Sequence, residues 1–234
     1  MKPNSLFPIT YSLPLTTNSY LCKMKYFIKT PWWLKKLYSS YTWDIKTKEK
    51  IIYLSFDDGP HAIATGFVLD QLKKYNARAT FFCIGKNVLA EPQLYRRVID
   101  EGHSVGNHTQ HHLNGWKAKD TEYLADVTEA TQLIDSSLFR PPYGRITSFQ
   151  AKNIHKAMKK ENSRIVMWDV LSGDFDEKLS GDDCLKNVIL NAKNGSIVVF
   201  HDSEKAFPRL EYCLPIILEF FEKKGVRFEK IPNY

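Results

Sequence analysis

The sequence has little cysteine, no long apolar run and no internal repeat. Its four cysteines form no C-x-x-C pair, so neither a disulfide framework nor a zinc knuckle is indicated, and we expect buried free thiols at Cys22, Cys83, Cys184 and Cys213. No stretch approaches the uninterrupted apolar length that a membrane span requires. The 234 residues, with 43% hydrophobic and 25% charged residues, are typical of a globular chain that can bury a core.

Acidic residues are scarce in the first fifty positions. Residues 1–50 contain nine lysines but only Asp44 and Glu49, which gives a net charge of +7. Residues 51–234 contain 24 basic and 24 acidic residues, so their net charge is zero. The chain is therefore expected to consist of a basic N-terminal arm, residues 1–50, and a main domain, residues 51–234, that offers no nucleic-acid footprint.

The arm mixes lysine with tryptophan, tyrosine and phenylalanine between residues 23 and 43. One interpretation is a weak contact of residues 23–50 with a membrane surface or an anionic polymer. The other, which we favour, is that the aromatic rings pack against the main domain while the lysines stay in water. Residues 1–23 precede a second methionine and are expected to be disordered.

The first twenty residues match a signal peptide poorly. Proline and serine interrupt them, and they lack a charged start followed by a clean apolar run. The compartment therefore stays open between the cytoplasm and the periphery of the cell envelope. The sequence gives no indication of the oligomeric state.

From residue 51 onward, short β-branched or aromatic runs alternate with helical stretches. Strands are expected at 51–56, 79–85, 102–106, 139–144, 164–170, 195–202 and 225–231. Strands that alternate with helices predict βαβ units and parallel pairing. About seven units in roughly 180 residues predict an α/β fold whose sheet curls into a small, TIM-barrel-like (β/α) barrel, although an open doubly wound sheet fits the same period.

Chemically distinctive polar residues follow the predicted strands. They are Asp57, Asp58, His108, His112, Arg140, Asp169, Asp174 and His201. In an α/β barrel the carboxyl ends of the strands share one face, and that face carries the active site. The shared position of these residues predicts one site at that face.

Two adjacent carboxylates, Asp57 and Asp58, repel each other and have no basic neighbour in sequence. This suggests that one of them binds a cation, which removes the repulsion. His108 and His112 are four residues apart, a spacing that aligns both rings if the segment is a helical turn. Two imidazoles and one carboxylate leave a position open for water, as in catalytic zinc sites. The second carboxylate is then a candidate base. His201 is either the acid for a leaving group or a core histidine bonded to a backbone carbonyl.

Five short motifs occur in a fixed order along the chain. They are S-F-D-D-G-P (55–60), H-T-x-x-H (108–112), R-P-P-Y (140–143), W-D-V-L-S-G-D-F (168–175) and V-V-F-H-D (198–202). Together they resemble the motifs of polysaccharide deacetylases of the NodB-homology type, which are carbohydrate esterases, over roughly residues 50–230. The resemblance implies a distorted (β/α) barrel and metal-dependent hydrolysis of an acetyl group on a sugar.

By position, the resemblance makes Asp57 the general base, His201 the general acid, and Asp58, His108 and His112 the metal ligands. Zn²⁺ is the expected metal, although Co²⁺ or a similar divalent ion also suits these ligands.

The resemblance also implies supporting roles. Arg140 would hold Asp57 and keep it ionised, and Asp174 would pair with His201 and favour its charged form. The backbone N–H of Tyr143, beside Pro142, would support the oxyanion. The R-P-P-Y-G stretch also makes a stiff turn, which is a purely structural alternative for these residues.

The chain departs from the family pattern at three positions. Leu171 stands where the fourth motif usually has its first aspartate, and Phe175 stands where it usually has tryptophan. Val199 replaces the usual leucine in what the resemblance makes the acetyl-methyl pocket. These changes put substrate preference in doubt more than catalysis.

Three functions remain in view. The first is deacetylation of an N-acetylated sugar in a peptidoglycan- or chitin-like glycan, and the second is hydrolysis of a sugar O-acetyl ester. The third is a non-catalytic glycan-binding barrel, which loss of the base or of a ligand would mark. Since Asp57, Asp58, His108, His112 and His201 are all present, the third is disfavoured.

Overall fold

The structure is a computed structural model that describes residues 26–233. The predictions for residues 1–23 and for the thiol of Cys22 lie outside the described residues. The other three cysteines, Cys83, Cys184 and Cys213, are buried free thiols, as predicted. No helix within residues 26–233 is long and apolar enough to cross a membrane.

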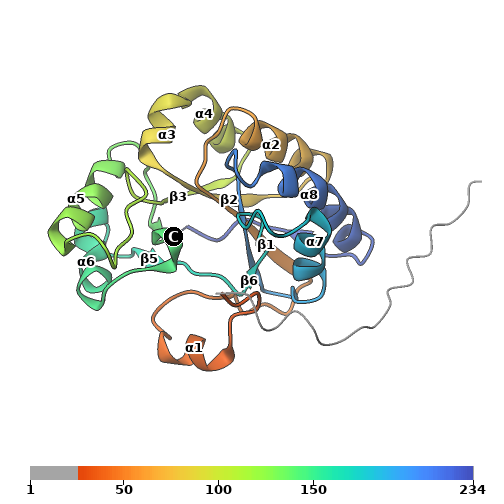
Figure 1. The fold of residues 1–234 in the computed structure, drawn as a ribbon, viewed down its shortest axis with the longest axis horizontal. Helices are drawn as coiled ribbons and strands as arrows, with labels where there is room; N and C mark the ends of the chain where they lie inside the picture. The colour runs from red at the N-terminus through yellow and green to blue at the C-terminus, as the bar shows by residue number, and fades with distance from the viewer. Residues whose placement is uncertain (1–25, 234) are drawn as a thin grey trace, which may run out of the picture.

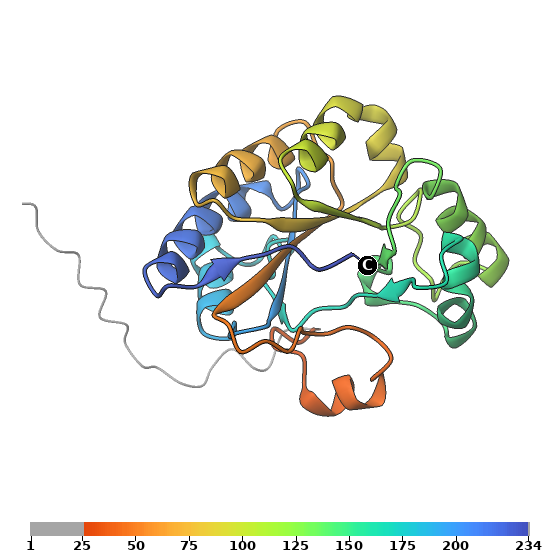
Figure 2. The ribbon, with the colours of Figure 1, turned by 180° about the vertical axis from the view of Figure 1, so that it is seen from behind.

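The core of the fold is a curled parallel sheet (Figures 1 and 2). Its strands are β1 (Ile51–Asp57), β2 (Ala79–Cys83), β3 (Ser104–Asn107), β4 (Leu138–Phe139), β5 (Arg164–Ile165), β6 (Val170–Leu171), β7 (Ile197–His201) and β8 (Arg227–Phe228). Seven strands pair in the order β5-β4-β3-β2-β1-β7-β6, and β8 pairs with β1. This is the strand order of a barrel left open between β5 and β6, so the predicted (β/α) barrel is confirmed and the doubly wound alternative is wrong.

Helices cover the outside of the sheet (Figure 1). They are α2 (Ala64–Lys74), α3 (Gly85–Ala90), α4 (Pro92–Asp100), α5 (Asp120–Ala130), α6 (Ser148–Met158), α7 (Gly181–Ile189) and α8 (Phe207–Glu222), while α1 (Trp32–Leu37) belongs to the arm and the short 3-10 helix η1 (Pro142–Gly144) follows β4. All seven residues of β1 are buried, because one face of the strand packs on α2 and α8 and the other faces the barrel interior.

The predicted strand at 164–170 is not continuous, because only its two ends join the sheet, as β5 and β6. The chain forms β5, leaves the sheet, and joins its opposite edge as β6. Between these strands the backbone bonds to the arm: Thr42 pairs with the segment after β5, and Met167 N donates to Thr42 O at 2.7 Å. On the other side Leu171 N donates to Ile28 O at 2.8 Å. The arm thus forms hydrogen bonds with backbone groups near the opening, which would pair with a neighbouring strand if the barrel were closed.

Asp169 does not join the predicted site. It is fully buried and accepts hydrogen bonds from Lys29 Nζ, Lys35 Nζ and Ser196 Oγ, each at 2.5 Å. The carboxylate is therefore a latch that fixes the arm to the barrel. Trp43 is buried, whereas Trp32 is 75% exposed. Only some of the aromatic rings of the arm therefore pack against the main domain. The domain boundary at residue 50 stays a prediction.

Candidate active site

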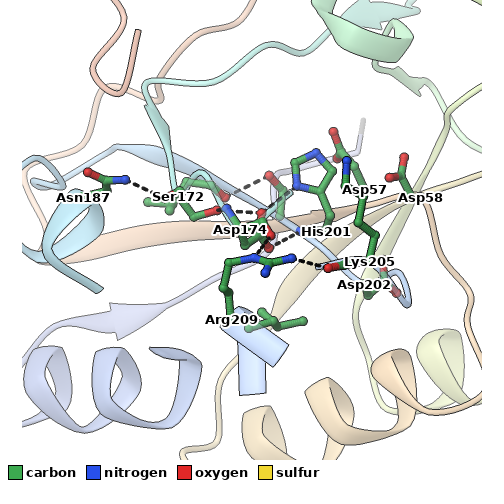
Figure 3. Close-up of polar contacts among 12 residues, drawn as sticks. Asp57, Asp58, Ser172, Asp174, Asn187, His201, Asp202, Lys205 and Arg209 are labelled. Carbon is green, nitrogen blue, oxygen red and sulfur yellow. Dashed lines mark hydrogen bonds and ion pairs between the residues drawn. The ribbon is translucent and has the colours of Figure 1, made fainter. Parts of the chain in front are cut away.

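The site lies at the carboxyl ends of the strands. Asp57 is the last residue of β1 and stands in register with His201, the last residue of β7. His108 follows β3 directly, and Arg140 follows β4. Figure 3 shows the side chains of Asp57, Asp58 and His201 close together at this end of the sheet. The parallel register thus gathers residues that are far apart in sequence.

Asp58, His108 and His112 form one group whose ligand atoms all lie within 4.8 Å of one another. Asp58 Oδ1 lies 3.2 Å from His112 Nε2 and 3.6 Å from His108 Nε2. This oxygen is buried, yet it accepts no hydrogen bond of acceptable geometry from any described residue. A buried acceptor without a partner is costly unless a cation satisfies it, so these three residues fit a divalent metal ion.

The orientation of His108 supports the same conclusion. Its Nδ1 lies 2.7 Å from the carbonyl oxygen of Arg140, which requires Nδ1 to carry the proton and leaves Nε2 as the ligand atom. Burial lowers the pKa of His108 to about 4, so the imidazole is neutral at pH 7. Burial raises the pKa of Asp58, but the contact with His112 and the charges of His201, His108 and His112 outweigh burial. The pKa of Asp58 is therefore well below its ordinary value. A neutral imidazole beside a carboxylate is the state in which both groups bind metal.

The metal-ligand loop is not the helical turn considered above. Thr109 and His112 both adopt left-handed backbone angles, with φ of 66° and 59°. Asp126 on α5 accepts hydrogen bonds from two backbone N–H groups of the loop, at 2.9 and 3.0 Å, and lies 2.6 Å from the ring of His111. The rings of His108 and His112 are brought together by this anchored loop, with centroids 5.1 Å apart.

Asp57 is held by a buried cation. Arg140 is fully buried, and its Nη1 donates to Asp57 Oδ1 at 2.7 Å. The carbonyl oxygens of Val166 and Met167 and the hydroxyl of Ser55 accept its other hydrogen bonds. Its guanidinium also lies 4.0 Å from the centre of a buried phenylalanine ring. Burial lowers the pKa of Arg140 and the charge of Asp57 opposes this, so the pair is an ion pair fixed in one orientation.

His201 is paired with Asp174 on two sides (Figure 3). Its ring Nδ1 lies 2.8 Å from Asp174 Oδ1, and its backbone N–H donates to Asp174 Oδ2 at 2.8 Å. Burial lowers the pKa of His201, but Asp174 outweighs this and raises it to about 9, with Asp58 and Asp57 contributing. The ring is charged at pH 7, and its partner is a carboxylate, so the alternative of a core histidine bonded to a backbone carbonyl is wrong.

The remaining predicted residues surround this centre. Tyr143 is 61% exposed, and the centre of its ring lies 4.6 Å from that of His112, while Pro142 is buried in the same turn. Phe175 lies 5.2 Å from the ring of His201. Val199 is buried in β7 and shares the interior face with His201 because the two are two residues apart. The roles of these residues stay predictions.

Sequence reasoning overlooked several supporting residues. Asp202 accepts hydrogen bonds from Gly59 N at 3.0 Å and Thr65 Oγ1 at 2.5 Å and so fixes the turn that carries Asp58. Burial raises the pKa of Asp202 to about 8. Asp202 directly follows His201 in the fifth motif, and this position could have indicated its role from the sequence. Arg209 on α8 donates to the backbone oxygen of Asp174, and nothing in the sequence near it indicated that contact.

Comparison with known proteins gives consistent matches. The family model described as polysaccharide deacetylase matches residues 44–164. A peptidoglycan-N-acetylglucosamine deacetylase of Bacillus cereus is 36% identical over 193 residues, which are 80% of this chain and 89% of that protein. The peptidoglycan-N-acetylmuramic acid deacetylase PdaC of Bacillus subtilis is 31% identical over 68% of this chain and 33% of its own length.

A solved structure agrees with this assignment. The crystal structure of the peptidoglycan N-acetylglucosamine deacetylase Bc1960, in complex with 4-naphthalen-1-yl-N-oxidanyl-benzamide, superimposes with a TM-score of 0.77 at 31% identity. The match covers 87% of this chain and 95% of that one. The fold, the gathered polar residues and these relatives agree, and the chain belongs to the polysaccharide deacetylase family.

Proposed function

We propose that the protein is a metal-dependent hydrolase that removes the acetyl group from N-acetylated sugars of a peptidoglycan-like glycan. The observation that carries this proposal is the Asp58–His108–His112 group, whose ligand atoms lie within 4.8 Å of one another. An Arg140-bound Asp57 and an Asp174-bound His201 belong to the same face. This set supplies a base, an acid and a cation site, which is what hydrolysis of an amide requires.

In this proposal Asp58, His108 and His112 hold a divalent cation such as Zn²⁺ or Co²⁺. When bound, the cation supplies a Lewis acid that polarises the acetyl carbonyl and makes a water more acidic. Asp57 accepts the proton of the attacking water, because Arg140 holds its carboxylate in one orientation at 2.7 Å. The backbone N–H of Tyr143 donates to the developing oxyanion.

His201 then completes the reaction. Asp174 occupies its Nδ1, so Nε2 is left to give a proton to the sugar nitrogen as the C–N bond breaks, which releases acetate and a free amine. A nitrogen leaving group needs this proton more than an alkoxide does, since an amide anion is far more basic. The pKa of His201, raised to about 9, supports its role as the proton donor at neutral pH. The relatives named as peptidoglycan deacetylases support the same substrate class.

The decisive experiment is acetate release from a substrate panel, with and without a chelator. The panel contains N-acetylglucosamine oligomers, N-acetylated peptidoglycan and an O-acetylated xylan. We expect release from the N-acetylated glycans, loss of release with the chelator, and recovery when Zn²⁺ is added. Release that ignores the chelator, or release from the xylan alone, would refute the proposal.

The ligand set has its own test. His108→Ala should abolish stoichiometric zinc binding, because it removes one of three ligand atoms. His155→Ala on α6, which is outside the candidate metal group, is the matched control and should bind zinc like the parent protein. Metal content of the two purified variants measures the difference, and stoichiometric zinc in His108→Ala would contradict the assignment.

A further inference from the structure

A hollow of about 310 Å³ lies between the arm and the barrel. Most of its lining is aromatic: Phe27, Tyr38 and Tyr41 come from the arm, and Trp116, Tyr143 and Trp168 come from the barrel. This volume falls at the lower end of small-molecule sites, which enclose about 300–1,000 Å³. The hollow therefore has the size and the lining of a ligand site.

The arm side of the hollow is held rigidly. Lys29 and Lys35 bind the buried carboxylate of Asp169, and Thr30 Oγ1 donates to the carbonyl oxygen of Trp168 at 2.7 Å. The rings of Tyr38 and Tyr41 are stacked, with centroids 5.6 Å apart and planes 17° from parallel. Lining residues that are ordered before binding lose little entropy when a ligand arrives.

Two lining residues of the hollow lie beside residues of the candidate active site. Tyr143 lines it, and the ring of Tyr143 lies 4.6 Å from the ring of His112. Tyr26 of the arm also lines it, and its ring lies 5.1 Å from that of Phe175, which in turn lies 5.2 Å from His201. A ligand in the hollow would therefore be a neighbour of the group at the catalytic centre.

The chemistry of the lining favours a neutral sugar. Within the described chain, no charged residue lines the hollow, which disfavours an anionic lipid headgroup or an anionic polymer. Trp116, Phe27 and Tyr38 are 65%, 56% and 43% exposed, and exposed aromatic groups of this kind mark binding surfaces. Aromatic faces attract the C–H bonds of a pyranose ring, and tyrosine hydroxyls bond to its hydroxyl groups.

We infer that arm residues 26–43 form a subsite for a neutral N-acetylhexosamine unit next to the unit that is deacetylated. These residues precede the segment 44–164 that matches the family model. The inference rests on the proposed function for the identity of the glycan. It gives the aromatic arm a role in selecting glycan chains over single sugars.

The test compares three variants of the full chain. Phe27→Ala and Tyr38→Ala remove aromatic rings that line the hollow, and Trp32→Ala removes an exposed ring of the same arm that does not line it. We expect the first two to lower kcat/KM for N-acetylglucosamine hexamers about threefold to tenfold, the effect of an ordinary aromatic contact, and to leave the rate on the N-acetylglucosamine monomer unchanged. Trp32→Ala should match the parent protein on both substrates.

Oligomer binding, followed by tryptophan fluorescence, separates the two proposals. If the parent protein binds the hexamer but releases no acetate, and Phe27→Ala weakens that binding, the subsite survives and the proposed function fails. Equal hexamer binding and equal rates for the parent protein and Phe27→Ala would overturn the subsite. So would equal losses in Trp32→Ala, or a loss in Phe27→Ala confined to binding of phosphatidylglycerol vesicles, which would assign the arm to a membrane surface.

Discussion

At the residue scale, the two adjacent carboxylates have opposite partners. Asp57 ends β1 and faces the guanidinium of Arg140. Asp58 has a left-handed backbone, with φ of 80°, which turns its side chain toward His108 and His112. The two neighbouring residues therefore face different partners, so Asp57 is the candidate base and Asp58 is the candidate metal ligand.

The first prediction concerns this separation. Asp57→Asn should retain stoichiometric zinc and lower kcat about 10²–10⁴-fold, because an amide cannot accept the proton of water. Zinc content and acetate-release kinetics measure the two properties. Asp58→Asn is the matched variant and should lose zinc. Near-parental turnover by Asp57→Asn would show that another group is the base.

The second prediction concerns the pH dependence that Asp174 gives to His201. The folded pKa of about 9 lies above the ordinary value of 6.5, so the acid is protonated below about 9 and is lost as the pH rises through that value. Asp174→Asn removes the carboxylate and should move the alkaline limb of the kcat/KM profile toward 6.5. An unmoved limb would mean that His201 is not the acid.

At the scale of elements, the arm replaces the pairing that β5 and β6 lack. Its backbone bonds to the chain after β5 through Thr42 and to β6 through Ile28. Asp169 adds two ion pairs to this contact, with Lys29 and Lys35 side chains only 33% and 20% exposed. Removal of one partner from a partly buried pair leaves the other charge without its partner, and this costs more than the loss of an exposed pair.

The third prediction follows from this latch. Asp169→Asn should lower the free energy of unfolding by about 1–3 kcal/mol, because hydrogen bonds to charged groups are lost. Asp182→Asn breaks an exposed ion pair on α7 and should cost about 0–1 kcal/mol. Urea unfolding of both variants measures the difference. Equal costs would show that the latch contributes no more than a surface pair.

At the scale of the whole molecule, the arm and the barrel form one structure around the site. The fourth prediction is that deletion of residues 1–23 leaves acetate release and the Tm unchanged, whereas deletion of residues 1–43 lowers both. The longer deletion removes the backbone partners of Met167 and Leu171 and the lysines bound to Asp169. Thermal unfolding and activity assays compare the two truncated proteins. Loss of folding in the shorter deletion would show that the first residues are structural.

Local pattern was sufficient to predict much of this protein. Strand and helix periods are properties of consecutive residues, and parallel strands end on one face, so Asp57, Asp58, His108, Arg140 and His201 could be assigned to one site before any contact was known. The barrel is confirmed by the strand order. The catalytic roles within the site stay predictions.

The tertiary structure alone decided what depends on distant partners. The run at 164–170 has strand-forming residues, yet its middle part spans the opening between β5 and β6 because the arm supplies its hydrogen bonds. Asp169 resembled a site residue by position, and only the lysines of the arm, more than 130 positions away, revealed it as a latch. The loop of His108 and His112 is set by Asp126 rather than by helical spacing. The periodicity of hydrophobic residues indicates which residues share a face of a helix or strand. Contacts between distant segments depend on how the whole chain folds.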